Sequence, residues 1–283
     1  MITSRENARV KQVCAYQSKK KERDRDGVFV AEGWRLVSEA PPEALAEVYV
    51  SASFRVRASS EEQRFLEQNA AVVTDVSDAV FAKMSAVKTP QGILAVVKRR
   101  EQDAPGLRQA QPADDSGTLS SSKGPSAPVL ILDGIQDSGN LGTIFRSAEA
   151  AGVSHILMSA DCADIYNPKV VRATMGSIFR IPFSQTEDLP AEIRALREGP
   201  GVRVFAAMLD QQARAYHTID MTERPVGFVI GNEANGIRAE VAEACDDRVY
   251  IPMAGKNESL NAAVSASVLL FEAARQRASC STP

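Results

Sequence analysis

Residues 129–152, VLILDGIQDSGNLGTIFRSAEAAG, combine an apolar run, a polar turn and a helical pattern in one short stretch. The run VLIL at 129–132 is continuously apolar, which is typical of a parallel strand covered on both faces. The turn that follows contains Gly and Asn, and it leads into a helix expected near 141–151 that Gly152 ends. The stretch therefore predicts one strand–turn–helix unit of a parallel α/β domain.

The same alternation continues to the C-terminus. It predicts strands at 153–160, near 179–183, and at 202–209, 226–231 and 248–252, and helices around 168–175, at 189–198, after Gly236 and from about Ser259 to Arg277. These elements predict a mostly parallel sheet with helices on both faces. Ligands of such sheets collect at the carboxyl ends of strands, so the loops after Leu132, Ile230 and Ile251 are expected to carry function.

The N-terminal part has a second set of alternating elements. Strands are expected at 28–33, 46–51, 71–75 and 92–97, and helices at 5–20, 34–39 and 61–69. Between the two parts, residues 98–128 contain no Val, Ile, Met or aromatic residue but four Pro, three Gly and five Ser. Such a segment buries too little apolar surface to fold, so it is expected to be a flexible linker. The predicted organisation is an α/β domain at 1–97, the linker, and a larger α/β domain at 129–283.

The composition excludes several classes of protein. The 283 residues are 44% apolar and 24% charged, which is ordinary for a globular chain. No apolar run approaches the ~18 residues of a membrane span, and the polar N-terminus has no signal-peptide core, so a cytoplasmic location is expected. The four cysteines form no C-x-x-C pair, and two histidines exclude a His-rich metal site. No metal is therefore expected.

The net charge of −3 is unevenly distributed along the chain. Residues 1–97 have 14 basic and 13 acidic side chains, whereas residues 129–283 have 14 and 19. The first 25 residues have eight basic and three acidic side chains, with a cluster at Lys19–Lys21, Arg23 and Arg25. This cluster could contact phosphates or could simply be the solvated end of a helix.

Each of the three loops, taken alone, has a purely structural explanation. The first loop is not a G-x-G-x-x-G or Walker motif, because its glycines fall at 134, 139 and 142 and no Gly-Lys-Ser/Thr follows. Asn140 could be a helix N-cap and Arg146 a surface residue. In the other two loops, Glu233 could close a turn and Ser259 could cap the last helix.

Together and in this order, the loops resemble the three signature motifs of the SpoU/TrmH family of RNA 2'-O-ribose methyltransferases, in the SPOUT superfamily. D-x-x-x-D-x-G-N-x-G-x-x-x-R spans residues 133–146, G-N-E-x-x-G spans 231–236, and I-P-M-x-G-x-x-E-S-L-N spans 251–261. Residues 29–40 and 89–97 resemble that family's substrate-binding domain, which has a ribosomal-protein-L30e-like fold. Ser138 departs from the family pattern, which often has Pro there.

The resemblance implies a fold, a cofactor and a partner. The fold is α/β: a C-terminal SPOUT-type α/β domain with a deep trefoil knot, preceded by a small L30e-like α/β domain. The cofactor is S-adenosylmethionine (SAM), bound in the knot, and the chain is expected to be a homodimer through the knotted domain. The substrate is expected to be 23S ribosomal RNA, with transfer RNA as the alternative.

The resemblance also implies roles for individual residues. The catalytic set is Arg146, Asn140, Ser259, Asn261 and Glu233, and the cofactor-binding set is Gly231, Ile251, Met253 and Leu260. Because a guanidinium stays protonated in proteins, Arg146 is expected to hold the target phosphate and stabilise the developing alkoxide rather than act as a literal base. The remaining polar residues would orient the ribose or support the loops.

Other functions stay open at the level of the sequence. A catalytically silent RNA-binding or ribosome-assembly protein would keep the same fold, a base methyltransferase would differ in its product, and a dehydrogenase would need the missing G-x-G-x-x-G. The last helix presents Leu260, Val264, Val268 and Phe271 on one side. This apolar face predicts either packing against the sheet or a subunit interface.

Overall fold

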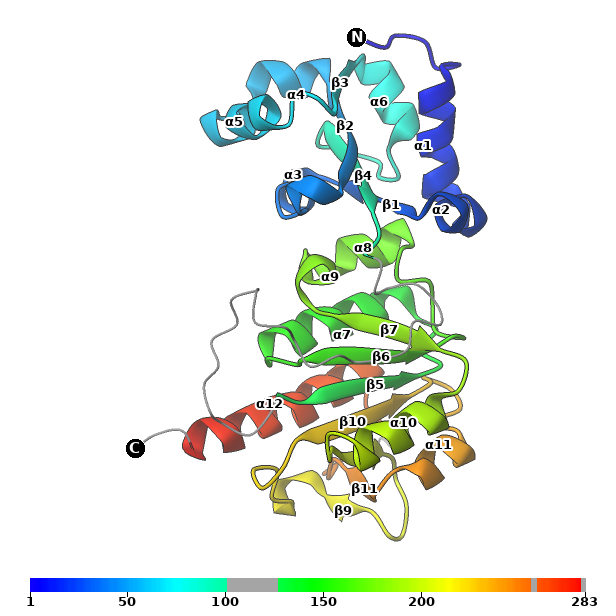
Figure 1. Ribbon diagram of the computed structural model, residues 1–283, viewed down its shortest axis with the longest axis vertical. Helices are drawn as coiled ribbons and strands as arrows, with labels where there is room; N and C mark the ends of the chain where they lie inside the picture. The colour runs from blue at the N-terminus through cyan, green and yellow to red at the C-terminus, as the bar shows by residue number, and fades with distance from the viewer. Residues whose placement is uncertain (101–126, 256–258, 281–283) are drawn as a thin grey trace. The chain divides into compact units, whose positions relative to one another are not determined.

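The computed structural model describes residues 1–100, 127–255 and 259–280, and the chain divides into two compact units (Figure 1). One unit contains the N-terminal described residues together with Asp164–Arg180, and the other contains the rest of the chain. Most of the predicted linker, residues 101–126, lies outside the described residues.

The N-terminal unit is an α/β sandwich, as predicted. Its strands are β1 (Val28–Glu32), β2 (Leu45–Ser51), β3 (Val73–Val76) and β4 (Ile93–Lys98), in the order β1-β4-β2-β3. Strand β4 is antiparallel to both of its neighbours, whereas β2 and β3 are parallel. The carboxyl ends of β1, β2 and β3 therefore meet the start of β4 at one edge of the sheet.

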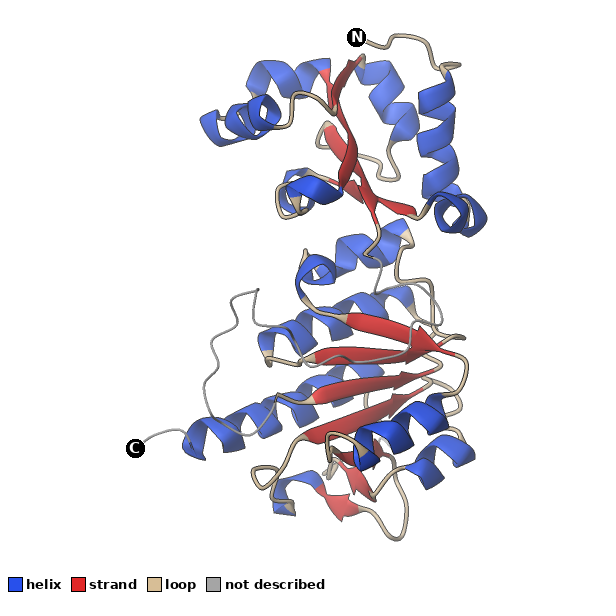
Figure 2. Cartoon of the chain, in the orientation of Figure 1, coloured by secondary structure: helices blue, strands red, loops and turns tan. Residues whose placement is uncertain are grey.

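Helices cover both faces of this sheet (Figures 1 and 2). One face carries α1 (Ala8–Ser18) and α6 (Asp78–Met84), and the other carries α3 (Trp34–Val37), α4 (Ala52–Arg57) and α5 (Ser60–Gln68). The short helix α2 (Lys20–Asp26) precedes β1. The core under α1 and α6 is apolar and fully buried, with Val10, Tyr49 and Phe81 among its members.

A segment from the middle of the chain completes the N-terminal unit. It contains α8 (Pro168–Thr174) and α9 (Ser177–Arg180), and α8 packs against β1. The Phe29 ring lies 5.0 Å from that of Tyr166 and 5.9 Å from that of Phe179. The strand predicted near 179–183 begins only at Phe183, as β7. Phe179 lies in the helix α9 instead, where its ring contacts Phe29.

Two arginines of the predicted basic cluster are neutralised within this unit. Arg23 is 2% exposed and pairs with Asp164. Arg25 pairs with Glu22 and Asp26, each at 2.8 Å. Only Lys19–Lys21 stay exposed without an ion pair to another described residue, so the part of the cluster that is available to phosphates is smaller than the sequence indicates.

The second unit has a fully parallel seven-stranded sheet. Its strands are β5 (Val129–Asp133), β6 (His155–Ser159), β7 (Phe183–Thr186), β8 (Arg203–Ala207), β9 (Arg214–Ala215), β10 (Val226–Gly231) and β11 (Asp247–Tyr250). The order is β7-β6-β5-β10-β8-β11-β9. The predicted parallel sheet is confirmed, although the sequence analysis missed the two-residue strand β9.

Two pairs of helices cover this sheet (Figure 2). Helices α10 (Leu189–Glu198) and α11 (Ala239–Ala244) pack over a core that includes Ile131, Val204 and Val229. Helices α7 (Ser138–Ala150) and α12 (Ala262–Cys280) lie against each other and cover the opposite face. No helix in the described part of the chain is long and apolar enough to cross a membrane.

Candidate active site

Two motif loops begin side by side because their strands are neighbours. Strand β5 pairs with β10 in a register that sets Asp133 opposite Gly231. The loop that follows each strand therefore leaves the same carboxyl edge of the sheet. The third motif loop follows β11, which lies on the far side of β8 from β10. The loop nevertheless reaches the first loop, because Asn261 near its end is hydrogen bonded to Asn140.

Glu233 of the second loop binds the first loop. Its carboxylate accepts the backbone N–H groups of Gln136 at 3.1 Å and Asp137 at 3.2 Å, and the Asn140 side-chain amide at 2.9 Å. The predicted turn-closing role of Glu233 is therefore replaced by a contact between loops. Burial raises the pKa of Glu233, but the hydrogen bonds from Asn140, Gln136 and Asp137 outweigh it and hold that pKa below its usual range.

Asn140 connects all three loops. Its amide donates to Glu233, and its carbonyl oxygen accepts the Asn261 amide at 2.8 Å. The N-cap of α7 is Asp137, whose carboxylate accepts the Asn140 backbone N–H at 2.8 Å. The Asn140 side chain is thus not used for capping. We call this chain of contacts the Glu233–Asn140–Asn261 network.

Asn261 has two roles at the start of the last helix. Its side-chain oxygen accepts the backbone N–H groups of Ala263 at 2.9 Å and Val264 at 3.3 Å, which makes it the cap of α12. The prediction that Ser259 caps this helix is therefore wrong, because the helix begins three residues later. Ser259 is exposed, and the described structure gives it no hydrogen bond to the other candidate residues.

Replacing Glu233 with Gln is expected to loosen the network. A carboxylate only accepts hydrogen bonds, whereas a Gln amide would turn its NH₂ group toward N–H donors of the first loop. Because the pKa of Glu233 is lowered in the folded chain, its stabilising contribution is present above the ordinary carboxyl pKa and is lost as the pH falls through the lowered value. Urea denaturation between pH 3 and 7 should show this dependence in the wild type and a weaker one in Glu233→Gln. Identical pH profiles would contradict the assignment.

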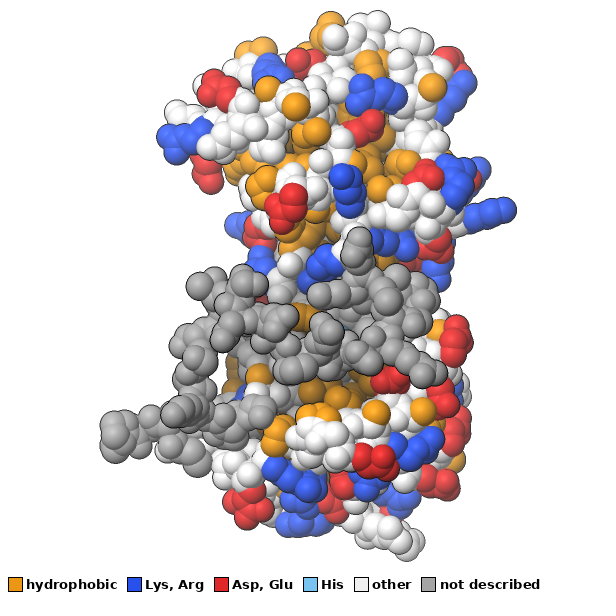
Figure 3. All heavy atoms as spheres, viewed as in Figure 1, with side chains coloured by type: hydrophobic (Ala, Val, Ile, Leu, Met, Phe, Trp, Pro, Cys, Tyr) orange, Lys and Arg blue, Asp and Glu red, His pale blue; other side chains and the backbone are white. Residues whose placement is uncertain are grey.

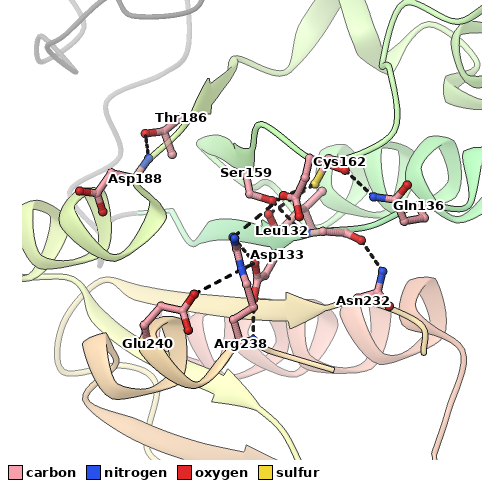
Figure 4. Close-up of polar contacts among 12 residues, drawn as sticks. Leu132, Asp133, Gln136, Ser159, Cys162, Thr186, Asp188, Asn232, Arg238 and Glu240 are labelled. Carbon is pink, nitrogen blue, oxygen red and sulfur yellow. Dashed lines mark hydrogen bonds and ion pairs between the residues drawn. The ribbon is translucent and has the colours of Figure 1, made fainter. Parts of the chain in front are cut away.

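An ion pair between a buried carboxylate and a half-exposed arginine anchors the other end of the second loop. Asp133 is 1% exposed, and its carboxylate accepts the Arg238 backbone N–H at 2.8 Å and the Arg238 Nε at 2.7 Å (Figure 4). Arg238 is the N-cap residue of α11, and the hydrogen bond to Asp133 raises its pKa. The sequence analysis found Asp133 as the first residue of a motif but did not find its partner.

The second loop closes tightly between these anchors. Asn232 and Gly236 exchange two backbone hydrogen bonds of 2.9 Å, and Gly236 takes a φ of +71°, which glycine adopts without strain. A Cβ at Gly231 would overlap the backbone of Gly236 and Ile237. The Asn232 side chain also donates to the Gly134 carbonyl at 2.7 Å (Figure 4). Gly231 therefore has a steric reason to be glycine that does not depend on a ligand.

Arg238→Ala is expected to lower the free energy of unfolding by about 2–3 kcal/mol. The substitution leaves the buried Asp133 carboxylate with only a backbone N–H for a partner, whereas half of the Arg238 side chain is already solvated. Urea denaturation measures the change. Arg194→Ala is the matched control, because Arg194 is exposed on α10 and has no ion pair with another described residue. Equal stability of the two variants would show that the pair does not anchor the loop.

Arg146 lies apart from the network on α7. It is six residues after Asn140, which is ~9 Å along a helix. Its side chain is exposed, and it forms no ion pair within the described ranges. The structure therefore leaves its guanidinium available for a ligand but does not bring it into contact with Asn140.

The expected cofactor residues lie along the carboxyl edge of β10, β8 and β11. Ile251 and Met253 are half-buried just after β11, and Leu260 is 38% exposed. Leu209, just beyond β8, is 63% exposed at the same edge and was missed. Its signal in the sequence was an apolar residue at the end of a predicted strand. This edge thus offers apolar side chains and the free backbone groups of strand ends, which suit an adenosine group.

An open depression of about 530 Å³ lies beside these loops, lined by Gln136, Asp137, Asn232, Glu233, Ala234 and Asn235. Across the described residues, no three His, Cys, Asp or Glu side chains gather as a metal ion would require. The described side chains at this edge offer hydrogen-bonding groups and an apolar wall.

Known proteins are similar to this chain in sequence and in structure. Residues 127–271 match the model of the SpoU rRNA Methylase family, and residues 7–95 match that of the MRM3-like substrate binding domain. A Bacillus subtilis relative named 23S rRNA (guanosine(2553)-2'-O)-methyltransferase RlmP is 31% identical over 95% of this chain and 97% of its own length. The Bordetella pertussis 23S rRNA (guanosine-2'-O-)-methyltransferase RlmB is 34% identical over 83% of this chain and 91% of its own length. The AdoMet-bound rRNA methyltransferase of Sinorhizobium meliloti is 30% identical, with a TM-score of 0.79 and 97% of each chain covered.

Proposed function

Because the chain belongs to the SpoU rRNA methylase family, we propose that it transfers a methyl group from SAM to a ribose 2'-hydroxyl of 23S ribosomal RNA. The observation that carries the proposal is the Glu233–Asn140–Asn261 network, which joins the three motif loops at the carboxyl edge of a parallel sheet. The network brings two amide side chains from different motif loops to one place at this edge, where they could both contact one substrate. A ribosomal RNA substrate would be met in the cytoplasm, where we propose that the chain works.

The apolar edge fits the cofactor. SAM, when bound, supplies an electrophilic methyl group on a sulfonium centre. Ile251, Met253 and Leu260 would hold its adenosine part, together with backbone groups near Gly231, and Leu209 joins this set because it lies exposed at the same edge. The AdoMet bound to the Sinorhizobium meliloti relative supports the same assignment.

The polar residues would act on the RNA. As the 2'-hydroxyl loses its proton, its oxygen gains negative charge, and a fixed cation nearby stabilises that charge. Arg146 is the exposed cation that would do so while holding the target phosphate. Asn140 and Asn261, fixed by Glu233, would orient the ribose, since alignment alone is worth up to ~7–11 kcal/mol for well-placed reactants. Ser259 would help to position the ribose from the third loop.

An apolar face on α12 supports a homodimer. Val264 is 46% exposed and Phe271 49% exposed, and the half-buried Val268 lies between them on the helix. Large apolar side chains exposed in a row mark interaction sites. Helix α7 lies against α12, and Ser147 and Ser267 are hydrogen bonded at 2.8 Å between them. A partner on this face would therefore also meet the exposed surface of α7, which carries Arg146.

The organisation of the chain follows the same proposal. In this proposal residues 1–97 form the L30e-like RNA substrate-binding domain, residues 98–128 a linker and residues 129–283 the methyltransferase domain with its trefoil knot. Strand β4 extends the first domain to Lys98, and Asp164–Arg180 packs with that domain. The matched substrate binding domain at 7–95 supports the first assignment. In support of the knot, the chain leaves the sheet after β11 and returns past β10 as α12, which packs beside α7.

The test is transfer of labelled methyl groups from SAM to separate ribosomal and transfer RNA fractions. Nucleoside mass spectrometry of the product should find 2'-O-methylribose in 23S RNA. A methylated base would identify a base methyltransferase. Label in transfer RNA alone would show that the substrate is transfer RNA rather than 23S RNA. Absence of transfer to either fraction, with RNA binding retained, would identify a silent binding protein.

A further inference from the structure

The only tryptophan of the chain lies at the edge of the N-terminal sheet. Trp34 is the first residue of α3, directly after β1, and it is half-buried. Its ring meets the Phe65 ring of α5 edge-on, with centroids 5.3 Å apart and planes at 84°. Figure 1 shows α3 and α5 on the same face of the sheet. Phe65 thus supports one side of an indole that solvent still reaches.

The backbone under Trp34 is fixed from three segments. Gly33 takes a φ of +97°, and its N–H donates to the Ile93 carbonyl at 2.9 Å. The Trp34 N–H donates to the Gln91 side-chain oxygen at 2.9 Å. Arg57 of α4 donates to the Gln91 backbone carbonyl. The residue is therefore held in place by the loop before β4 as well as by its own helix.

Three exposed arginines lie on the helices of this face. Arg35 follows Trp34 on α3 and Arg64 precedes Phe65 on α5. Arg57 of α4 donates to the Gln91 carbonyl and lies over the Phe54 ring, 5.4 Å from its centroid. None of the three has an ion pair among the residues that the structure describes. Arg9, Arg25, Arg55 and Arg99 of the same unit are each paired with a carboxylate.

The positive charge of these three arginines is local and does not show in the net charge of the N-terminal part. Residues 1–97 have 14 basic and 13 acidic side chains, so the net charge of the N-terminal part gives little attraction for a polyanion. A cluster of unpaired guanidinium groups can still bind phosphates, because each presents a planar set of donors. An aromatic ring among such groups is the usual arrangement for unpaired bases.

We propose that Trp34, Arg35, Arg57 and Arg64 form an RNA-binding surface on which an unpaired base stacks against Trp34 while the arginines bind the neighbouring phosphates. We call it the Trp34 surface. The inference rests on the proposed function, because the partner is taken to be the RNA substrate. Stacking of one base on an aromatic side chain is worth about 1–3 kcal/mol.

The fluorescence of Trp34 reports on this surface directly, since no other tryptophan contributes. Titration of the full chain with a 23S RNA transcript should change the emission and saturate at the Kd measured by filter binding. A fully paired RNA duplex of equal length should bind without that change, because its bases are not free to stack.

Three variants of this surface and one control variant separate the effect of stacking from that of charge. Trp34→Leu should raise the KM for RNA about tenfold at unchanged kcat, and Trp34→Phe should recover part of the loss. Arg35→Ala should weaken binding and reduce the slope of log Kd against log salt by about one. Arg194→Ala removes the same charge from an exposed site on α10 and should have no effect.

The outcomes show separately whether the proposed RNA-binding surface fails and whether the proposed methyl transfer fails. Bound RNA without a change in emission, or equal emission changes with paired RNA, would overturn stacking on Trp34. Wild-type affinity in Trp34→Leu and Arg35→Ala would overturn the surface as an RNA site and assign it to a protein partner, even if methyl transfer proceeds. A Trp34-dependent affinity without methyl transfer would uphold the surface and refute the methyltransferase.

Discussion

Arg146→Ala is expected to lower kcat for methyl transfer by about 10²–10³-fold, as removal of one charge-stabilising donor does in other active sites. The Kd of SAM should not change, because Arg146 lies on α7 and the apolar cofactor edge follows β10, β8 and β11. Single-turnover transfer of labelled methyl groups to 23S RNA measures the rate of methyl transfer, and calorimetry measures the Kd of SAM.

Two further variants control for general effects of charge. Arg146→Lys keeps the charge but loses the planar donor set, so it should recover only part of the rate. Arg194→Ala should transfer at the wild-type rate. Full activity of Arg146→Ala would exclude the role assigned to its guanidinium, and loss of SAM affinity together with kcat would point to a cofactor-binding role.

Val264→Glu combined with Phe271→Glu is expected to convert a dimer to monomers and to abolish most of the methyl transfer. In a two-fold symmetric interface each substitution occurs twice, so two changes bring four carboxylates into one apolar contact. Sedimentation equilibrium at micromolar protein concentration measures whether the chain is a dimer or a monomer. Val56→Glu is the matched control, because Val56 is 87% exposed in the N-terminal unit. An active wild-type monomer would contradict the expectation.

Mixed dimers would then locate Arg146 relative to the network. If Arg146 acts on the site of its partner, a dimer of one Arg146→Ala chain and one Asn140→Ala chain contains one intact site. Random mixing should then restore about a quarter of the wild-type activity. If both residues act within one chain, mixing restores none.

The fold was predictable where the pattern is local. The helix at 189–198 and the strand at 226–231 have the expected bounds, because both are apolar segments with clear turn signals around them. The helix at 177–180 was not predictable, because an apolar run of this length fits a strand as well as a helix. Its structure depends on Phe29, which lies far away in the sequence.

The candidate site was predictable in its residues but not in its contacts. The spacing of the motifs identified Asn140, Glu233 and Asn261, and the network joins them. Their partners depend on strand register, which a single sequence does not reveal. Asp133 and Arg238 are 105 residues apart and meet only because β5 and β10 are neighbours. For the same reason Arg23 looked available for RNA, whereas Asp164 neutralises it.

The packing of α8 and α9 against β1 sets an order of events on the ribosome. The four-stranded sheet is synthesised by residue 98, but Arg23 and Phe29 find their partners only when residues 164–180 emerge. At 5–20 residues per second, the nascent chain waits roughly 4–16 s for this segment. During that time an arginine that ends up buried has no counter-ion, and an aromatic ring faces water. The N-terminal domain is therefore completed only after part of the second domain has been translated.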